Sequence, residues 1–143
     1  MDKLISQELL NLIVNFNNLK YLNKILKQID IKDISSKEFQ ILYLISNYEP
    51  CNLTKISEIV QYPNSTVCRI IDKLNEAKLI KKHDSKNNSD RRKKKLSPTE
   101  KGEKIINIFI KQHIKISTFI VGDIPNQNLA LVLEKLKKFF SHF

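Results

Sequence analysis

Apolar residues recur every three or four positions over most of the chain, which is the spacing of one face of an α-helix. The longest such stretch covers residues 4–29, where a second flank formed by Leu10, Ile13 and Ile25 is also apolar. We predict one long helix here, and its broad apolar arc requires burial on more than one side. Its main stripe consists of Ile5, Leu9, Leu12, Phe16, Leu19, Leu22, Leu26 and Ile29.

A second helix is predicted over residues 35–48. Ser35 or Ser36 can cap it, and the spacing from Ser35 to Glu38 fits a capping box. Pro50 ends the segment. The side chains expected on its buried face are Phe39, Leu42, Tyr43 and Ile45.

Two further helices follow in close succession. Residues 52–62 predict a short helix with Asn52 or Thr54 as its cap, and residues 63–80 predict a longer one with Pro63 in its first turn. The longer helix has a core face of Val67, Ile70, Ile71 and Leu74. Its opposite face carries Thr66, Arg69 and Lys73. A short helix, a tight turn and an amphipathic helix with a basic outer face are typical of a helix-turn-helix.

The next segment predicts a β-hairpin. Residues 80–83 and 92–96 are short candidate strands, and the residues between them are polar turn formers. Residues 81–95 contain eight basic and two acidic side chains. Their net charge of +6 is more than half of the net charge of +10 of the whole chain.

Two helices are predicted to end the chain, over residues 99–121 and 126–140, with Gly122 and Pro125 between them. Thr99 caps the first of them. Their apolar positions are Ile105, Ile106, Phe109, Ile110, His113, Ile116, Ile120, Leu129, Val132, Leu133, Leu136, Phe139 and Phe140, with His113 completing the stripe.

Composition agrees with a single, mainly α domain. The chain has 143 residues, enough to bury a core, and only two Gly and four Pro. The net charge of +10 favours a polyanionic partner, either nucleic acid or an anionic membrane surface. The longest apolar runs, such as 41–45, have five residues, whereas a membrane span needs about 20.

Enzymatic and metal-binding motifs are missing from the sequence. It has no Gly-rich phosphate loop, nucleophile elbow, HExxH motif or paired Cys ligands, so we do not expect an enzyme. His83, His113 and His142 are far apart and lack metal-ligand spacing.

The sequence also suggests where the protein resides. The first residues carry Asp2 and Glu8 and no signal-peptide cleavage pattern, so we expect a cytoplasmic protein. Cys51 and Cys68 are then expected to be reduced thiols. A small, half-buried thiol is the favoured reading of Cys68 over an oxidant sensor.

Residues 65–82 (STVCRIIDKLNEAKLIKK) and 90–102 (DRRKKKLSPTEKG) resemble the MarR family of bacterial transcriptional regulators. In that family a wing motif Asp-x-Arg is followed by Thr-x-x-Gly, and Asp90, Arg92, Thr99 and Gly102 stand at those places. The resemblance implies a single domain over residues 1–143, mainly α, with a winged helix-turn-helix core and a two-stranded β-hairpin wing. It divides the chain into a DNA-binding lobe and dimerisation helices. The lobe would cover 35–102, and the helices 1–30 and 104–143.

Three features depart from the family pattern. Lys78 stands where the family commonly has Gly, so we expect the preceding helix to end without the usual left-handed Gly. Pro98 replaces the usual Leu before Thr99, and the hairpin between Ile80 and Asp90 is a residue or two longer than the commonest form. These departures bear on the angle of the wing and on its reach.

The candidate DNA contacts lie on the outer face of the predicted helix 63–80 and in the hairpin. On the helix they are Asn64, Ser65, Thr66, Arg69 and Lys73, because groups at a helix start bind phosphates and Asn or Arg can read base edges. The resemblance implies that Arg92 enters the minor groove while Asp90 holds the wing tip through a local ion pair. The expected phosphate contacts are Arg91, Lys93, Lys94 and Lys95. An ordinary amphipathic surface helix and a solvated charged loop are the alternatives.

The flanking helices carry more apolar surface than a three-helix core can cover. Either a monomer folds its two ends together or, as the resemblance also implies, a two-fold homodimer interdigitates them, and we favour the homodimer. The resemblance further implies a small effector ligand, for which Phe16, Tyr43 and Phe109 are candidate linings that core packing explains equally well.

We therefore expect a regulator that binds a pseudo-palindromic site in double-stranded DNA, with no cofactor required for binding. An architectural DNA-binding protein without an effector, or a protein–protein adaptor on the same fold, is the alternative. Ligand-induced loss of DNA binding separates the regulator from the architectural protein, and DNA binding at low salt separates both from the adaptor.

Overall fold

A computed structural model describes residues 2–83 and 93–142 of the chain. Helices dominate it, together with a two-stranded antiparallel sheet, which confirms the predicted winged-helix fold class. The elements are α1 (Lys3–Asn15), α2 (Leu19–Gln28), α3 (Ser36–Asn47), α4 (Leu53–Val60), α5 (Asn64–Glu76), β1 (Ile80–His83), β2 (Lys95–Pro98), α6 (Glu100–Val121) and α7 (Asn126–Ser141).

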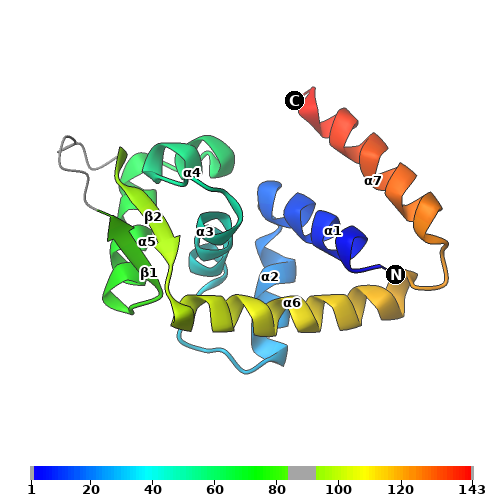
Figure 1. The fold of residues 1–143 in the computed structure, drawn as a ribbon, viewed down its shortest axis with the longest axis horizontal. Coiled ribbons are helices and arrows are strands. Elements are labelled where there is room, and N and C mark those ends of the chain that lie inside the picture. Colours follow the sequence, from blue (N-terminus) through cyan, green and yellow to red (C-terminus); the bar gives the residue numbers. More distant parts are fainter. Residues whose placement is uncertain (1, 84–92, 143) are drawn as a thin grey trace.

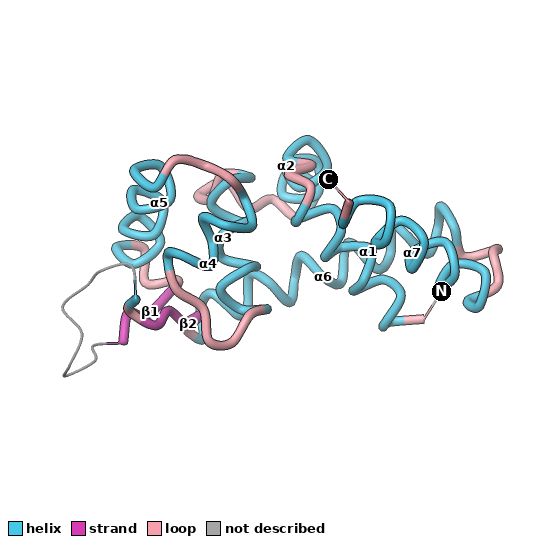
Figure 2. Tube along the Cα trace, turned by 90° about the horizontal axis from the view of Figure 1, so that it is seen from above, coloured by secondary structure: helices cyan, strands magenta, loops and turns pink. Residues whose placement is uncertain are grey.

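The molecule is elongated, and its two ends differ in content. α4, α5 and the sheet gather at one end beside α3, whereas α1 and α7 lie side by side at the other end (Figure 1). α6 runs along the length of the molecule between these ends, and the view from above shows the same order (Figure 2). α6 therefore extends through both parts of the molecule.

The prediction of one helix over residues 4–29 is wrong, because the chain breaks between α1 and α2. Asn17 adopts a left-handed conformation with φ 55°, which a continuing helix does not allow. Asn18 then starts α2 by accepting a hydrogen bond from the Tyr21 amide at 3.3 Å. The Asn17 side chain donates to the Val60 carbonyl at 3.1 Å, so a contact distant in sequence holds the break.

Local capping signals specify the starts of the central helices. The predicted capping box is confirmed: the Ser35 side chain accepts from the Glu38 amide, and the Glu38 carboxylate accepts from the Ser35 amide. Asn52, rather than Thr54, caps α4 by accepting from the Lys55 amide at 2.9 Å. Ser35 and Asn52 are thus the caps among the alternatives that the sequence left open.

The core is built around α3, which is buried continuously from Glu38 to Ile45. Phe39 of α3 stacks on Phe109 of α6 with ring centroids 4.0 Å apart. The predicted core face of α5 is confirmed, since all four of its apolar side chains are buried. Because α3 is surrounded on every side, its polar residues need internal partners.

The sheet differs from its prediction in the second strand. β2 covers Lys95–Pro98 instead of residues 92–96, and Ile80 pairs with Pro98 in its register. The Leu96 amide donates to the Cys51 carbonyl at 2.8 Å, which extends the pairing beyond the hairpin. Pro98 is compatible with the strand end, because its missing N–H removes no ladder hydrogen bond there.

Candidate nucleic-acid interface

The start of α5 is open to solvent. Pro63 occupies the N-cap position, and no side chain in the described part of the chain caps this helix. The sequence predicted Pro63 in the first turn of this helix, whereas in the structure Pro63 immediately precedes α5. Asn64 and Ser65 are exposed at the helix start. Unpaired N–H groups at a helix start carry partial positive charge, so this end of α5 suits a phosphate.

The outer face of α5 faces solvent as the sequence predicted. Arg69 is exposed and Thr66 is half-buried, and neither belongs to the buried core face of α5. Cys68 is also half-buried on this helix. Asn64, Ser65, Thr66 and Arg69 therefore share an accessible surface, and their contact with DNA stays a prediction.

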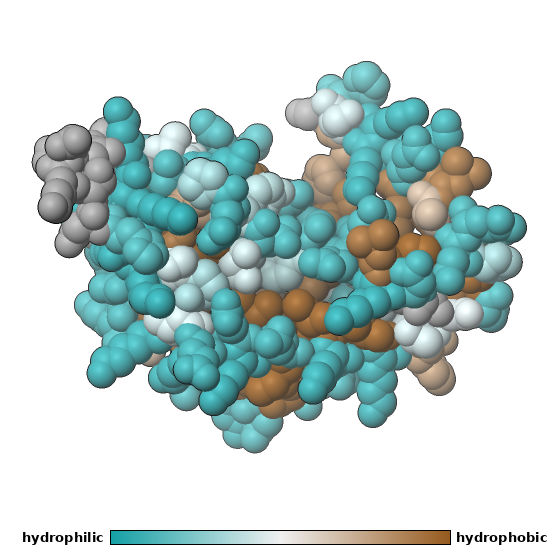
Figure 3. Space-filling view, in the orientation of Figure 1, coloured by the Kyte–Doolittle hydropathy of each residue, from teal (hydrophilic) through white to brown (hydrophobic). Residues whose placement is uncertain are grey.

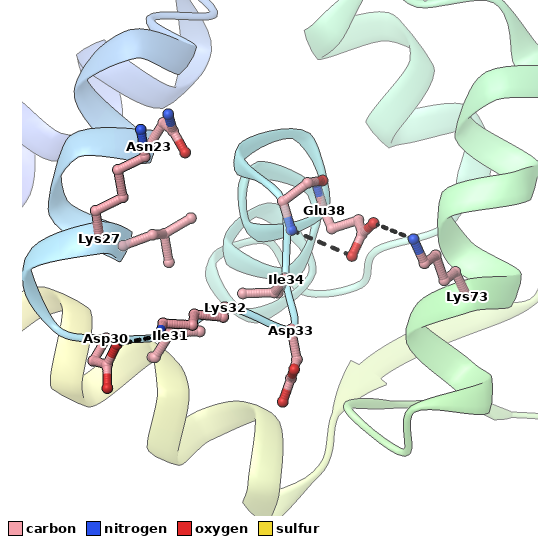
Figure 4. A pocket seen from close by; sticks show the side chains of 11 residues that line it. Asn23, Lys27, Asp30, Ile31, Lys32, Asp33, Ile34, Glu38 and Lys73 are labelled. Carbon is pink, nitrogen blue, oxygen red and sulfur yellow. Dashed lines mark hydrogen bonds and ion pairs between the residues drawn. The ribbon is translucent and has the colours of Figure 1, made fainter.

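Lys73, also predicted to contact DNA, already has a partner inside the protein. Its Nζ lies 2.9 Å from Oε1 of Glu38, a carboxylate whose side chain is only 10% exposed. Figure 4 shows this pair beside the Ser35–Glu38 hydrogen bond, at the edge of a cavity of about 480 Å3 between α2 and the start of α3. Lys73 thus attaches α5 to the N-terminal turn of α3. Its charge is partly neutralised before any DNA is present.

A second ion pair attaches α5 to the wing. Lys82 of β1 lies 2.8 Å from Asp72 of α5, with both side chains partly shielded from solvent. This pair was not predicted from the sequence, although Asp72 and Lys82 are only ten positions apart. Asp72 and Glu76 also place negative charge on the C-terminal half of α5. The end of α5 that suits DNA is therefore its N-terminal half.

The C-terminus of α5 differs from the expectation in two ways. The helix ends at Glu76 rather than continuing to residue 80, and Lys78 itself takes the left-handed conformation, with φ 60°. The Leu79 amide donates to the Leu74 carbonyl and the Lys78 amide to the Asn75 carbonyl, both at 3.0 Å. These two bonds form a Schellman motif, which normally carries Gly at the position of Lys78.

The Thr-x-x-Gly motif fixes this turn against α6. Thr99 caps α6 as predicted, and its hydroxyl donates to the Lys78 carbonyl at 2.6 Å while its amide donates to the Leu79 carbonyl at 3.0 Å. A Cβ atom on Gly102 would lie 2.2 Å from the Leu79 carbonyl oxygen. Only Gly allows this close approach. The motif therefore sets the position of the wing and the end of α5 on α6.

The wing contributes basic side chains of unequal accessibility. Lys93 and Lys95 are exposed. Lys94 is half-buried and lines a small apolar gap with Leu53 and Leu96, so its stem is partly packed against protein. The predicted contacts Asp90, Arg91 and Arg92 lie outside the described residues, so their roles stay predictions.

The cysteines and histidines have structural surroundings. Burial raises the pKa of the Cys51 thiol to about 11, so this thiol stays protonated at neutral pH. His113 is fully buried: its Nε2 lies 2.8 Å from the Ser6 carbonyl, and its Nδ1 lies 2.5 Å from the Tyr21 hydroxyl. This arrangement fits a neutral imidazole that donates to Ser6 and accepts from Tyr21.

Metal sites and membrane spans are both absent from residues 2–83 and 93–142. No group of three or more His, Cys, Asp or Glu side chains there could hold a metal ion. The helices of the same residues are too short or too polar to cross a membrane.

Comparison with known proteins gives a consistent picture. The model of the MarR family matches residues 34–94. The HTH-type transcriptional regulator YybA of Bacillus subtilis (strain 168) is 34% identical over 82 residues, which are 56% of this chain and 53% of YybA. The match thus spans about half the length of this curated relative.

Solved structures with the same fold cover nearly the whole chain. Staphylococcus aureus MarR in complex with salicylate and kanamycin has a TM-score of 0.70 and 23% identity, covering 96% of this chain and 91% of that one. A MarR family regulator from Listeria monocytogenes complexed with 26mer DNA has a TM-score of 0.70 and 21% identity, covering 99% and 89%. Streptococcus pneumoniae FabT in complex with DNA has a TM-score of 0.69 and 24% identity, covering 95% and 93%. At these identities the likeness shows the fold.

Proposed function

We propose that the chain is a transcriptional regulator of the MarR family that binds duplex DNA, since the MarR family model matches its residues 34–94 and the relative YybA is an HTH-type regulator. The observation that carries the proposal is the open N-terminal end of α5, with Asn64, Ser65 and Arg69 exposed beside a basic hairpin. The two related structures with bound DNA support it. The relatives are described as transcriptional regulators, which agrees with the expectation that the chain is not an enzyme.

The contacts of the proposed complex divide into two kinds. The first turns of α5 enter the major groove, where Asn64 and Arg69 can reach base edges and Ser65 and Thr66 can bind phosphates. The wing follows the phosphate backbone through Lys93 and Lys95, which are exposed. Lys94 adds a weaker phosphate contact, because its stem is partly packed.

For the remaining predicted contacts the proposal keeps the roles that the family pattern implies. Arg92 enters the minor groove and Asp90 holds the wing tip, while Arg91 meets phosphates. Lys73 contributes mainly through its attachment of α5 to Glu38.

We further propose that the protein acts as a homodimer through residues 1–30 and 104–143, with residues 35–102 as the DNA-binding lobe. Large apolar side chains stay exposed on a single chain, including Phe119 at 91%, Phe139 at 57% and Leu131 at 55%. Hydrophobic patches lie over the end that carries α1 and α7 and over the lower middle of the molecule, whereas the end with the sheet is mostly hydrophilic (Figure 3). A second copy of the chain covers such patches on both partners at once.

The single chain also shows contacts between its own ends. Lys137 of α7 lies 3.5 Å from Glu8 of α1, and the Phe16 and Phe140 rings have centroids 4.2 Å apart. These contacts bring the chain ends together, as the monomer alternative requires, yet they leave the exposed phenylalanines of α6 and α7 uncovered. This remaining apolar surface is why we favour the homodimer.

Control by a small ligand is a finer part of the proposal. Of the three candidate linings, Tyr43 and Phe109 are buried in the core, and Phe109 stacks on Phe39, so core packing accounts for both. Phe16 is 48% exposed and packs on Phe140. Salicylate, which the Staphylococcus aureus structure contains, is the first ligand to test. If neither it nor a wider ligand screen releases the DNA, the architectural alternative is favoured.

A binding experiment tests the proposed function. Duplexes selected from a random pool by the protein are titrated at several salt concentrations, and log K is expected to fall by about 0.9 per neutralised phosphate for each unit of log[salt]. Footprints should show two inverted half-sites about 10 base pairs apart, and light scattering should give twice the 16.7 kDa of one chain.

A matched pair of variants places the interface. Arg69→Ala should weaken binding to the selected duplex about tenfold or more, whereas Lys32→Ala, which removes the same charge from an exposed position outside both the lobe and the dimerisation helices, should leave it unchanged. A salt slope near zero, or equal effects of the two variants, would contradict DNA binding through α5.

A further inference from the structure

A network of polar side chains connects three parts of the fold that are distant in sequence. Its centre is Gln40, which is fully buried in α3. The Gln40 Nε2 donates to the Val14 carbonyl at 2.9 Å and to the side-chain oxygen of Asn17. The Gln40 Oε1 accepts from the Tyr62 hydroxyl at 2.7 Å. The carboxamide of Gln40 therefore joins the end of α1 to the segment that leads into α5.

A second link closes this network into a ring. The Asn17 Nδ2 donates at 3.1 Å to the carbonyl of Val60, the last residue of α4. That carbonyl lies at a helix C-terminus, where intrahelical partners are missing. Asn17, Gln40, Tyr62 and Val60 thus form a closed circuit, completed by the backbone from Val60 to Tyr62.

The ring holds two backbone positions that are strained in isolation. Asn17, between α1 and α2, has φ 55°, and Gln61, between α4 and α5, has φ 58°. Residues other than Gly adopt this conformation at a cost, so the surrounding contacts have to hold it. Pro63 follows Gln61 after one residue and precedes α5 directly. The ring therefore acts where the chain turns into the proposed recognition helix.

We propose that Asn17 and Gln40 are positioning residues that hold the α4–α5 turn, and with it the N-terminal end of α5, at a set place relative to the α1–α2 junction. Their effect on DNA recognition rests on the proposed function, but their effect on the turn does not. Displacement of α1 against α3 is transmitted to α5 through this ring. A role limited to satisfying buried polar groups would lower the stability of the fold without a selective effect on the turn.

The cleanest perturbation is Asn17→Gly. Gly adopts positive φ without strain, so the backbone of the junction is kept while both side-chain links are removed. Asp30→Gly is the matched control, because Asp30 has φ 59°, is largely exposed, and pairs only with Lys32 among the ion pairs described. Tyr62→Phe is a second variant that removes the single hydrogen bond to Gln40.

Amide hydrogen exchange followed by NMR reads the turn directly. The Gln61 amide donates to the Ser57 carbonyl at 2.9 Å, and the Thr66 and Val67 amides both donate to the Pro63 carbonyl. In Asn17→Gly these three amides should exchange about fivefold to tenfold faster, whereas Asp30→Gly should leave them unchanged. Tyr62→Phe should show a smaller acceleration at the same amides. If Asn17→Gly does not fold, Tyr62→Phe alone tests whether the ring holds the α4–α5 turn.

DNA binding gives the second readout. For Asn17→Gly, the ratio of affinities for the selected duplex and for a scrambled duplex should fall about fivefold, with an unchanged salt slope, because the phosphate contacts remain. Unchanged exchange at the turn in both Asn17→Gly and Tyr62→Phe overturns the positioning role. Faster exchange together with an unchanged affinity ratio overturns its part in recognition. If the wild-type protein binds no duplex, the proposed function fails, and the exchange experiment still decides the positioning role.

Discussion

Lys78 is a residue whose replacement by Gly should stabilise the protein. It occupies the left-handed position of the Schellman motif at the end of α5, with φ 60°. A side chain in this conformation costs about 1–2 kcal/mol because its Cβ approaches the neighbouring carbonyl oxygen. Lys78→Gly removes this cost and keeps two hydrogen bonds of the backbone at this position, from its amide to the Asn75 carbonyl and from the Thr99 hydroxyl to its carbonyl.

One effect reduces the expected gain. Gly makes the unfolded chain more flexible, which lowers stability by about 0.4–1 kcal/mol. The exposed Lys78 side chain has no ion pair among those described, so its removal costs little. The net expectation is a stabilisation of about 0.5–1 kcal/mol. For a chain of this size, that raises the midpoint of thermal unfolding by about 1–4 °C.

The assay compares Lys78→Gly with Lys78→Ala. Both variants lose the same charge, but Ala keeps the Cβ, so only the Gly variant relieves the left-handed strain. Thermal unfolding followed by circular dichroism, at one protein concentration because assembly affects the midpoint, should place Gly above wild type and Ala at or below it. Equal midpoints for the Gly and Ala variants would show that the left-handed turn costs nothing, and the reasoning would be refuted.

Two further predictions concern the same framework. Gly102→Ala should destabilise the protein by about 1–3 kcal/mol in urea unfolding, because the Cβ of the new alanine would lie 2.2 Å from the Leu79 carbonyl oxygen. Lys104→Ala, at an exposed position of the same helix, is the control, and a urea midpoint for Gly102→Ala no lower than that of the control would contradict this close approach. Burial lowers the pKa of His113 below its ordinary value of 6.5. As the pH falls, the unfolded chain therefore binds a proton at this residue before the folded chain does. The contribution of His113 to stability should be constant above about pH 7 and fall as the pH drops below 6.5. The fall should be smaller in His113→Asn; an identical pH dependence would assign it to other groups.

The sequence predicts the parts of the candidate interface for which charge and periodicity carry the information, and their contact with DNA stays a prediction. The outer face of α5 follows from the buried spacing of its core residues, and the basic hairpin follows from composition. The partners of individual cations do not follow in this way. Lys73 pairs with Glu38, which is 35 positions away and belongs to another helix, so no local pattern reveals that its charge is already engaged.

The sequence by itself determined the elements whose ends are signalled locally. Ser35 with Glu38 marks the start of α3, and Thr99 marks the start of α6, because each cap bonds to amides within three residues. Only the tertiary structure decided the break between α1 and α2. The apolar spacing continues in phase across residues 4–29, so periodicity alone predicts one helix. Asn17 stays left-handed because its partners, Gln40 and Val60, are 23 and 43 residues distant and reach it only after the chain has folded.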